Sequence, residues 1–148
     1  MEKIRVILVD DHSLVRKGVR AALEAEQSIE IVGEAQNGEE ALEKLVELEP
    51  HVLLTDISMD GMSGLDLCEE AIEEFPGVKV LMLSMHLEPE YIVSAFDKGA
   101  SGFLNKDASD EEIVTAIKTV HSGEQYLTPT TSKMLANAFI KGKSEKGH

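Results

Sequence analysis

Several residue types are scarce in this sequence, and each scarcity narrows what the chain can be. The only cysteine among 148 residues is Cys68, which excludes an internal disulfide and a zinc site built from cysteines. No segment reaches the ~18 consecutive apolar residues of a membrane-spanning helix. The first residues, MEKIRV, lack the apolar core of a secretory signal peptide, so we expect a cytoplasmic protein without a membrane contact.

Positive charge is also scarce. The chain has 28 Asp and Glu residues against 14 Lys and Arg, which gives a formal charge of −14. Such a charge repels the phosphates of nucleic acids and of anionic lipids. We therefore expect that this chain does not bind DNA directly.

Short apolar runs alternate five times with longer amphipathic segments, which is typical of βα units around a parallel sheet. The predicted strands are residues 4–9, 30–34, 52–55, 78–83 and 101–104. The predicted helices are residues 14–26, 39–48, 65–75, 90–98 and 110–121. Several of the strands are almost wholly apolar, as expected for strands covered on both faces.

The βα alternation stops after the fifth helix. We divide the chain into a domain over residues 1–124 and a segment over residues 125–148. Thr128 and Pro129 offer an N-cap and a first-turn proline for a short helix that ends at about Ile140. Its apolar side would be formed by Met134, Leu135, Ala138 and Phe139. The polar end, KGKSEKGH, is expected to be disordered, and its last two residues are typical of a tag remnant.

Polar side chains follow four of the five predicted strands. Asp10 and Asp11 follow the first strand, Asp56 the third, Ser84 the fourth and Lys106 the fifth. Because the carboxyl ends of parallel strands meet at one edge of a sheet, we expect these side chains to converge. A single aspartate at a strand end is usually a turn or cap residue. Carboxylates, a hydroxyl and an ammonium group at one edge instead indicate a binding site.

Three carboxylates in one pocket need compensating charge. Two carboxylates about 5 Å apart near a protein surface repel by about 3 kcal/mol at an effective dielectric constant of about 20. Carboxylate oxygens without a histidine or cysteine nearby favour Mg²⁺, which is commonly shared with a phosphate. An aspartate can itself accept a phosphoryl group as an acyl phosphate. Asp56, the single acid at the end of a buried strand, is the candidate.

Five motifs occur in order along the chain: VILVDDHSLVRKGVRAAL, IVGEAQNGEEAL, LLTDISMDGMSGLDL, VLMLSMH and KGASGFLNKDAS. Together they resemble the receiver domain of bacterial two-component response regulators of the NarL/FixJ (LuxR) type. The resemblance implies an α/β fold of the flavodoxin-like (CheY-like) class. Its doubly wound parallel sheet would have five strands in the order 2-1-3-4-5 and five helices, to which the short C-terminal helix is added.

The resemblance also implies roles for the acidic residues. Asp56 would accept a phosphoryl group from a sensor histidine kinase. Asp10, Asp11 and Asp56 would bind Mg²⁺, and the backbone carbonyl of Ser58 would complete the protein's share of the metal ligands. Such a domain is not an enzyme in the ordinary sense, because it only accepts and loses its own phosphoryl group.

Ser84 and Lys106 would bind the phosphoryl oxygens, and Ser84 and Phe103 would form the switch that responds to them. Three positions depart from the family pattern. Asp60 replaces a proline, Phe103 replaces the commoner tyrosine, and Asn105 replaces an aliphatic residue. These departures bear on the amplitude of switching and on the lifetime of the phosphoryl group.

Regulators of this type usually continue into a helix-turn-helix domain, for which this chain has no room. We interpret the chain as part of a transcription factor that binds DNA only through such a domain and that forms a homodimer on phosphorylation. A stand-alone receiver that acts through protein contacts is the alternative.

Two further readings have less support. A phosphatase of the haloacid dehalogenase kind also uses an aspartate and Mg²⁺, but it has a second acid where this chain has Ser58. A scaffold with a vestigial site would not need the full set of site residues. His12 and His86 flank the expected pocket, and we interpret them as partly exposed loop residues.

Overall fold

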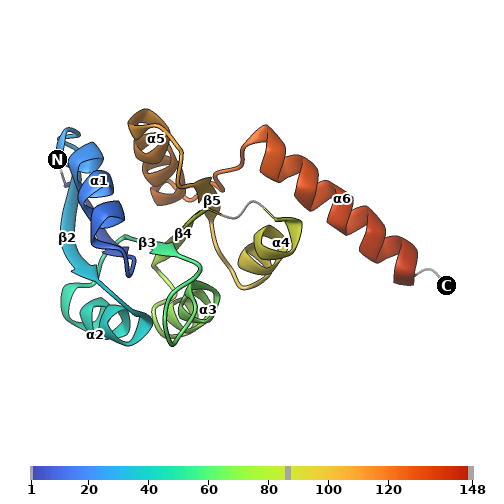
Figure 1. Ribbon diagram of the computed structural model, residues 1–148, viewed down its shortest axis with the longest axis horizontal. Helices are drawn as coiled ribbons and strands as arrows, with labels where there is room; N and C mark the ends of the chain where they lie inside the picture. Colours follow the sequence, from blue (N-terminus) through green and yellow to red (C-terminus); the bar gives the residue numbers. More distant parts are fainter. Residues whose placement is uncertain (1, 86–87, 147–148) are drawn as a thin grey trace.

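The structure of the protein is a computed structural model that describes residues 2–85 and 88–146 (Figure 1). Five parallel strands form one sheet in the order β2-β1-β3-β4-β5. The strands are β1 (Ile4–Val9), β2 (Ile29–Ala35), β3 (Val52–Asp56), β4 (Lys79–Ser84) and β5 (Gly102–Asn105). The predicted flavodoxin-like topology is confirmed, and each strand end lies within one residue of its predicted position.

In the described residues, six helices accompany the sheet: α1 (Ser13–Glu24), α2 (Gly38–Leu48), α3 (Gly64–Glu74), α4 (Pro89–Asp97), α5 (Asp110–His121) and α6 (Pro129–Lys146). In Figure 1, α1 and α5 cover one face of the sheet, and α2, α3 and α4 cover the other. Across residues 2–85 and 88–146, no helix combines the length and the apolarity needed to cross a membrane.

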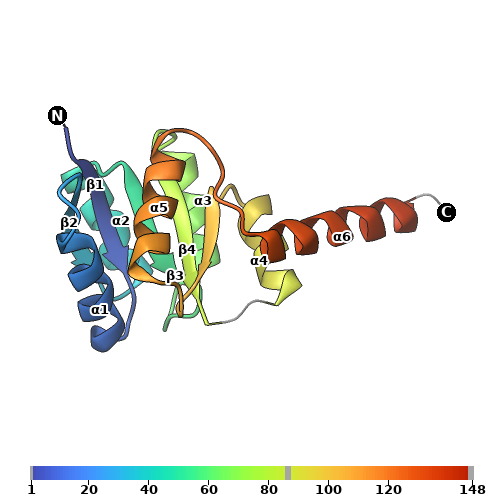
Figure 2. The same ribbon diagram turned by 90° about the horizontal axis from the view of Figure 1, so that it is seen from above.

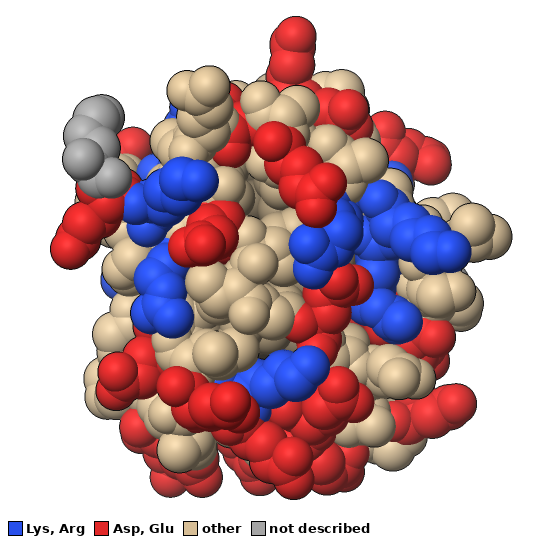
Figure 3. Space-filling view, turned by 90° about the vertical axis from the view of Figure 1, so that its left-hand side faces the viewer, with Lys and Arg blue, Asp and Glu red and all other residues tan. Residues whose placement is uncertain are grey.

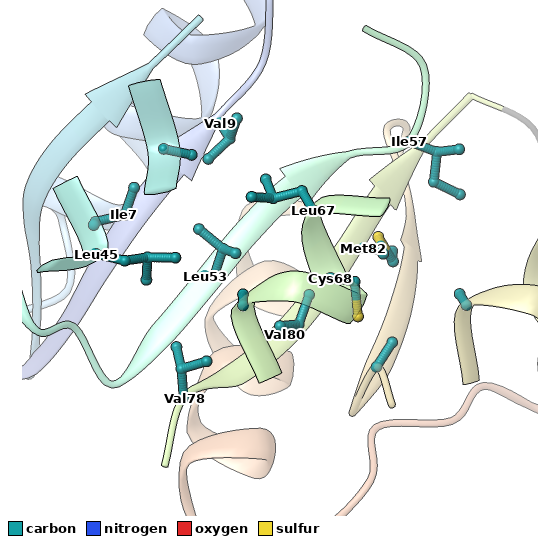
Figure 4. Close-up of a cluster of buried hydrophobic side chains, with 14 of the residues drawn as sticks. Ile7, Val9, Leu45, Leu53, Ile57, Leu67, Cys68, Val78, Val80 and Met82 are labelled. Carbon is teal, nitrogen blue, oxygen red and sulfur yellow. The ribbon is translucent and has the colours of Figure 1, made fainter. Parts of the chain in front are cut away.

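The central strands bury both of their faces, as their apolar sequences predict. In β1, Ile7 and Val9 belong to the hydrophobic cluster under α2, α3 and α4, part of which is drawn in Figure 4. Val6 and Leu8, which alternate with them, belong to the second cluster under α1 and α5. Burial on both sides fixes the register of each strand, because a shift by one residue would move every side chain to the opposite face of the sheet.

The register of the strands places the polar residues at one level. Val9 of β1 is paired with Thr55 of β3. Asp10 and Asp56, the next residue in each case, therefore lie at the same carboxyl edge of the sheet.

The C-terminal helix is longer than predicted. It begins at Pro129 as expected, and Thr128 Oγ1 accepts a hydrogen bond from the backbone N–H of Thr131 at 3.1 Å, which confirms the predicted cap. It ends at Lys146 instead of near Ile140, so the prediction of a disordered tail was wrong for residues up to 146. Lysine and glutamate are good helix formers, and a single glycine costs a helix only about 1 kcal/mol. The expected tag residues, 147–148, lie outside the described part.

The apolar side of α6 is only partly used. Met134 and Leu135 pack against the core, and Ala138 borders a hollow of about 590 Å³ between α4 and α6. Phe139, which we expected on the packed side, is 70% exposed. Figures 1 and 2 explain this, because α6 contacts α4 with its first part and then extends away from the domain.

Candidate functional site

The charged residues predicted at the strand ends do meet. Lys106 Nζ donates a hydrogen bond to Asp56 Oδ2 at 3.0 Å. The same nitrogen forms an ion pair with Asp10 Oδ2 at 3.0 Å. All three side chains are almost fully buried, with exposed fractions of 9% for Lys106, 4% for Asp56 and 1% for Asp10. One buried cation thus faces two buried carboxylates.

The loop between β1 and α1 carries the acid pair and is held by local hydrogen bonds. The backbone N–H of Asp10 donates to the carbonyl of Ala35 in β2 at 3.1 Å. The backbone N–H of His12 donates to Asp10 Oδ1 at 2.8 Å. The His12 ring nitrogen Nδ1 lies 3.0 Å from Asp10 Oδ1 and 2.9 Å from Asp11 Oδ1. The ring therefore bridges the two carboxylates.

His12 lies closer to the carboxylates than we predicted. We predicted a site of oxygen ligands without a nearby histidine, but the His12 ring belongs to the same cluster as the three aspartates. The side chain is 64% exposed, as expected for a loop residue. His86, the other histidine expected to flank the pocket, lies outside the described residues.

Asp56 is held through its backbone as well as its side chain. Thr55 Oγ1 donates to the Asp56 carbonyl at 3.0 Å, and the backbone N–H of Ser58 donates to Asp56 Oδ1 at 3.4 Å. The exposed Ser58 and Asp60 lie in the loop that follows. This loop connects Asp56 to the first turn of α3.

Gly64 is a residue of this site that our reading of the sequence missed. Its backbone N–H donates to the carbonyl of Ile57 at 2.7 Å. A Cβ atom at position 64 would lie 1.9 Å from the Asp56 carbonyl oxygen, so only glycine allows α3 to begin this close to the loop. Glycine at the first position of a helix, directly after the Ser63 N-cap, was the signal in the sequence.

Ser84 and Lys106 occupy the ends of β4 and β5. Ser84 is 1% exposed and is paired with Asn105 across the two strands. The backbone N–H of Lys106 donates to the Ser84 carbonyl at 2.9 Å. Asn105 Oδ1 accepts a hydrogen bond from the N–H of Asp107 at 2.8 Å. Asn105, one of the departures from the family pattern, thus fixes the turn that carries Lys106.

Phe103 lies on β5 and is buried, with 1% of its surface exposed. It belongs to the same hydrophobic cluster as Ile92 and Ala95 of α4. The aromatic side chain is therefore in its inward position, next to the helix that follows Ser84.

The site also shifts the protonation equilibria of its charged groups. Burial raises the pKa of Asp56, and the hydrogen bond from Lys106 opposes this effect. Burial lowers the pKa of Lys106, but its contacts with Asp56 and Asp10 outweigh the burial, and the net pKa is raised. Lys106 is therefore a fixed positive charge, and its main electrostatic effect is on the carboxylates.

The donor atoms fit a hard divalent cation. Oxygen or nitrogen atoms of Asp10, Asp11, His12 and Asp56 lie within 4.8 Å of one another. Among the described residues, the buried atom Asp10 Oδ2 faces only Lys106 Nζ, at 3.0 Å, and the buried atom Asp11 Oδ1 faces only the His12 ring, at 2.9 Å. Buried carboxylate oxygens with so few partners are costly unless a further cation faces them. Lys106 supplies one positive charge against three acids, so the pocket has the composition of a metal site.

Comparison with known proteins gives the family. The model of the response regulator receiver domain matches residues 6–118. The chain belongs to this family. The receiver domain described here is 38% identical over 144 residues to the transcriptional regulatory protein LnrK of Bacillus subtilis, covering 97% of this chain and 66% of that protein. It is 34% identical over 143 residues to the oxygen regulatory protein NreC of Staphylococcus carnosus, covering 96% and 66%.

Solved receiver domains have the same fold. The signal receiver domain of the response regulator NarL from Mycobacterium tuberculosis is 40% identical, with a TM-score of 0.80, and the match covers 84% of this chain and 100% of that one. The isolated receiver domain of RcsB from Salmonella enterica, determined with the phosphate mimic beryllofluoride, is 27% identical with a TM-score of 0.83, covering 90% and 99%. Our chain spans about 66% of the length of the curated relatives named above.

Proposed function

We propose that this receiver domain accepts a phosphoryl group on Asp56 from a sensor histidine kinase. The observation that carries the proposal is the position of Lys106, which contacts both Asp56 and Asp10 at the carboxyl edge of the sheet. In the transfer, an Asp56 carboxylate oxygen forms a bond to phosphorus while the bond between phosphorus and the histidine nitrogen breaks. The nitrogen keeps the electron pair of that bond and takes a proton.

Each site residue has a part in this transfer. Lys106 keeps Asp56 in position and compensates negative charge on the phosphoryl oxygens. Ser84, at the end of the adjacent strand, binds a second phosphoryl oxygen. Converting the carboxylate into a dianionic acyl phosphate adds about one negative charge to the pocket. A cation is therefore needed more after the transfer than before it.

We infer that the cation is Mg²⁺, held by Asp10, Asp11, Asp56 and the backbone carbonyl of Ser58. When bound, Mg²⁺ neutralises charge on the phosphoryl oxygens and keeps the transferred group in line with the carboxylate. The buried Asp10 and Asp11 oxygens support this assignment, because among the described residues they face only Lys106 and the His12 ring.

The phosphoryl group would be read out through Ser84 and Phe103. A Ser84 hydroxyl drawn toward the phosphoryl oxygens would open space for the Phe103 ring and repack α4, β5 and α5. We expect altered self-association as the result, with a homodimer in the phosphorylated state. Sedimentation with and without beryllofluoride measures this change, and an unchanged sedimentation coefficient would contradict it.

Residues 1–124 would act as the receiver, and residues 125–148 as the connection to an output domain. The relatives named as regulatory proteins are longer than this chain, and their names support a role in the control of transcription. DNA would be bound by that further domain, because the charge of −14 here repels phosphates. A sensor kinase draws its phosphoryl group from ATP, which supports action in the cytoplasm.

Intact-mass measurement after incubation with acetyl phosphate and Mg²⁺ tests the central proposal. The wild-type chain should gain one phosphoryl group, and the Asp56→Asn variant should gain none. Asp60→Asn is the matched control, because it removes an exposed acid from the same loop and should leave the gain unchanged. A phosphoryl group on the Asp56→Asn variant would overturn the assignment.

A further inference from the structure

An arginine near the start of α1 reaches back to the loop that carries the acid pair. Arg16 Nη1 donates a hydrogen bond to the backbone carbonyl of Asp10 at 2.5 Å. Its Nε lies 3.4 Å from Glu34 Oε1 at the end of β2. The Arg16 side chain is only 16% exposed, so it lies between α1 and the sheet edge and not in solvent.

Glu34 is itself fixed from two other directions. Arg20, one turn further along α1, donates to Glu34 Oε2 through Nε at 2.7 Å. Lys44 of α2 donates to the Glu34 backbone carbonyl. Figure 3 shows the face that includes α1, β2 and α2, on which lysine and arginine side chains lie among acidic ones. Glu34 is thus a firm anchor for Arg16.

The carbonyl that Arg16 binds belongs to the peptide group between Asp10 and Asp11. The orientation of this peptide group determines how the two carboxylates diverge from the chain. Two carboxylates about 5 Å apart repel by about 3 kcal/mol at an effective dielectric constant of about 20, which favours opening of the loop. A charge-assisted hydrogen bond to the carbonyl opposes this opening.

We propose that Arg16 is a positioning residue of the metal site, which holds the Asp10–Asp11 peptide group in the orientation that cation binding needs. The proposal rests on the function proposed above. Among the described residues, Arg16 bonds to the Asp10 backbone carbonyl and to Glu34 and to neither carboxylate of the acid pair, so it acts through the backbone. Glu34 keeps the guanidinium group in place, and Arg20 shares the anchor without reaching the loop.

A positional role and a purely electrostatic role have effects of opposite sign. If Arg16 acted only through its charge, removing it would strengthen cation binding, because a positive group near the site would be lost. If it positions the loop, removing it weakens cation binding. Loss of a residue that orients metal ligands typically lowers affinity by roughly 10- to 100-fold.

Titration calorimetry with Mg²⁺, repeated with Mn²⁺ and detected by electron paramagnetic resonance, measures this directly on the intact chain. We expect Arg16→Gln to weaken binding of both ions about tenfold. Arg16→Lys keeps the charge but cannot bind the Asp10 carbonyl and Glu34 at the same time. Its Mg²⁺ affinity should lie between those of wild type and Arg16→Gln. Arg20→Gln is the matched control, because it removes the same charge from the same partner, and its affinity should stay within about twofold of wild type.

A second measurement separates positioning from a general loss of structure. The rate of phosphorylation by acetyl phosphate, measured against Mg²⁺ concentration, should reach half its maximum at about tenfold more Mg²⁺ in Arg16→Gln. Its maximal rate should stay near that of wild type. Glu34→Gln should shift the curve in the same direction by less.

The outcomes are distinct. Equal or tighter cation binding in Arg16→Gln would overturn the positioning role while leaving the proposed function intact. A wild-type chain that neither binds Mg²⁺ nor accepts a phosphoryl group would overturn the proposed function and this inference with it. If Arg16→Gln does not fold, the decision passes to Arg16→Lys, whose wild-type affinity would equally overturn the role.

Discussion

The two halves of the site are built differently. The carboxylate half comprises Asp10, Asp11 and Asp56 with the loops after β1 and β3. The α4 half comprises β4, α4 and β5 with Ser84 and Phe103. In the carboxylate half, hydrogen bonds and the close approach of Gly64 fix the backbone. Helix α4, with nine residues, has no side-chain hydrogen bond at its N-cap and buries only Ile92 and Ala95 fully.

This difference separates two tasks. A cation site needs ligands that are already in place, because conformational freedom that the ligand residues lose on binding lowers the affinity for the cation. A response to phosphorylation needs an element whose packing is weak enough to change for a few kcal/mol. We therefore expect perturbations of the first half to affect cation binding and stability, and perturbations of the packing around α4 to change the local stability of α4 without changing cation binding.

The largest expected effect is at Gly64. Gly64→Ala places a Cβ atom 1.9 Å from the Asp56 carbonyl oxygen, so the start of α3 must move. We expect a loss of about 3 kcal/mol in the free energy of unfolding, measured by urea titration, together with weaker Mg²⁺ binding. Gly77→Ala is the control, because no atom lies within 4 Å of its added Cβ. Equal stability of the two variants would contradict the close approach.

The next effect concerns the acid pair. In EDTA, Asp11→Asn should be more stable than wild type by about 1 kcal/mol, because it relieves repulsion among the carboxylates. With Mg²⁺ at ten times its dissociation constant, wild type should gain about 1.4 kcal/mol, and Asp11→Asn should gain almost nothing. Thermal unfolding in both buffers checks this. A variant that is less stable than wild type in EDTA would mean that Asp11 has another, structural role.

A local effect is expected where α6 packs against the α4 half. Met134→Ala removes packing between α6 and the core, and it should cost about 1 kcal/mol because the side chain is only partly buried. Hydrogen exchange should accelerate in α4 while Mg²⁺ affinity stays unchanged. Phe139→Ala, at an exposed position of the same helix, should change neither quantity. A fall in Mg²⁺ affinity in Met134→Ala would contradict the independence of the two halves.

The smallest effect lies at the opposite edge of the sheet. His51 Nδ1 accepts the backbone N–H of Arg5 at 3.0 Å, and burial, then the charges of His121 and Arg5, lower the pKa of His51. The unfolded chain therefore takes up this proton at higher pH than the folded chain. The free energy of unfolding should fall as the pH falls from about 7 to about 5.

Urea titrations across this pH range compare the wild-type chain with His51→Gln, which cannot take up the proton. The free energy of unfolding should change less with pH in the variant than in the wild-type chain. The Mg²⁺ affinity at pH 7 should be the same in both. The same pH dependence of the free energy of unfolding in both chains would contradict the role of His51.

Much of this arrangement could be predicted from the sequence, because it follows from apolar patterning. The apolar runs predicted strands that bury both faces. The polar residues directly after these runs predicted that Asp10, Asp56 and Lys106 would meet at the carboxyl edge of the sheet. The contact of Arg16 with a carbonyl was not predictable, because backbone acceptors leave no pattern in a sequence. Gly64 was missed because glycine after a serine cap has several explanations.

The C-terminal helix shows the opposite limit. Composition predicted a disordered end, but the helix continues to Lys146 because helix propensity is additive along a segment and one glycine does not stop it. The exposure of Phe139 was not predictable either, because helical periodicity gives a face but not the length of the neighbour that covers it. Helix α4 is half as long as α6, with nine residues against 18.

This difference in length makes α6 a lever. At 1.5 Å per residue, its 18 residues measure about 27 Å, and only the first part rests on α4. If α6 follows α4 as a rigid rod, a rotation of about 10° moves its far end by about 5 Å over that length. A repacking too small to alter the shape of the domain would thus become a displacement of almost one helical turn, at a point remote from the pocket.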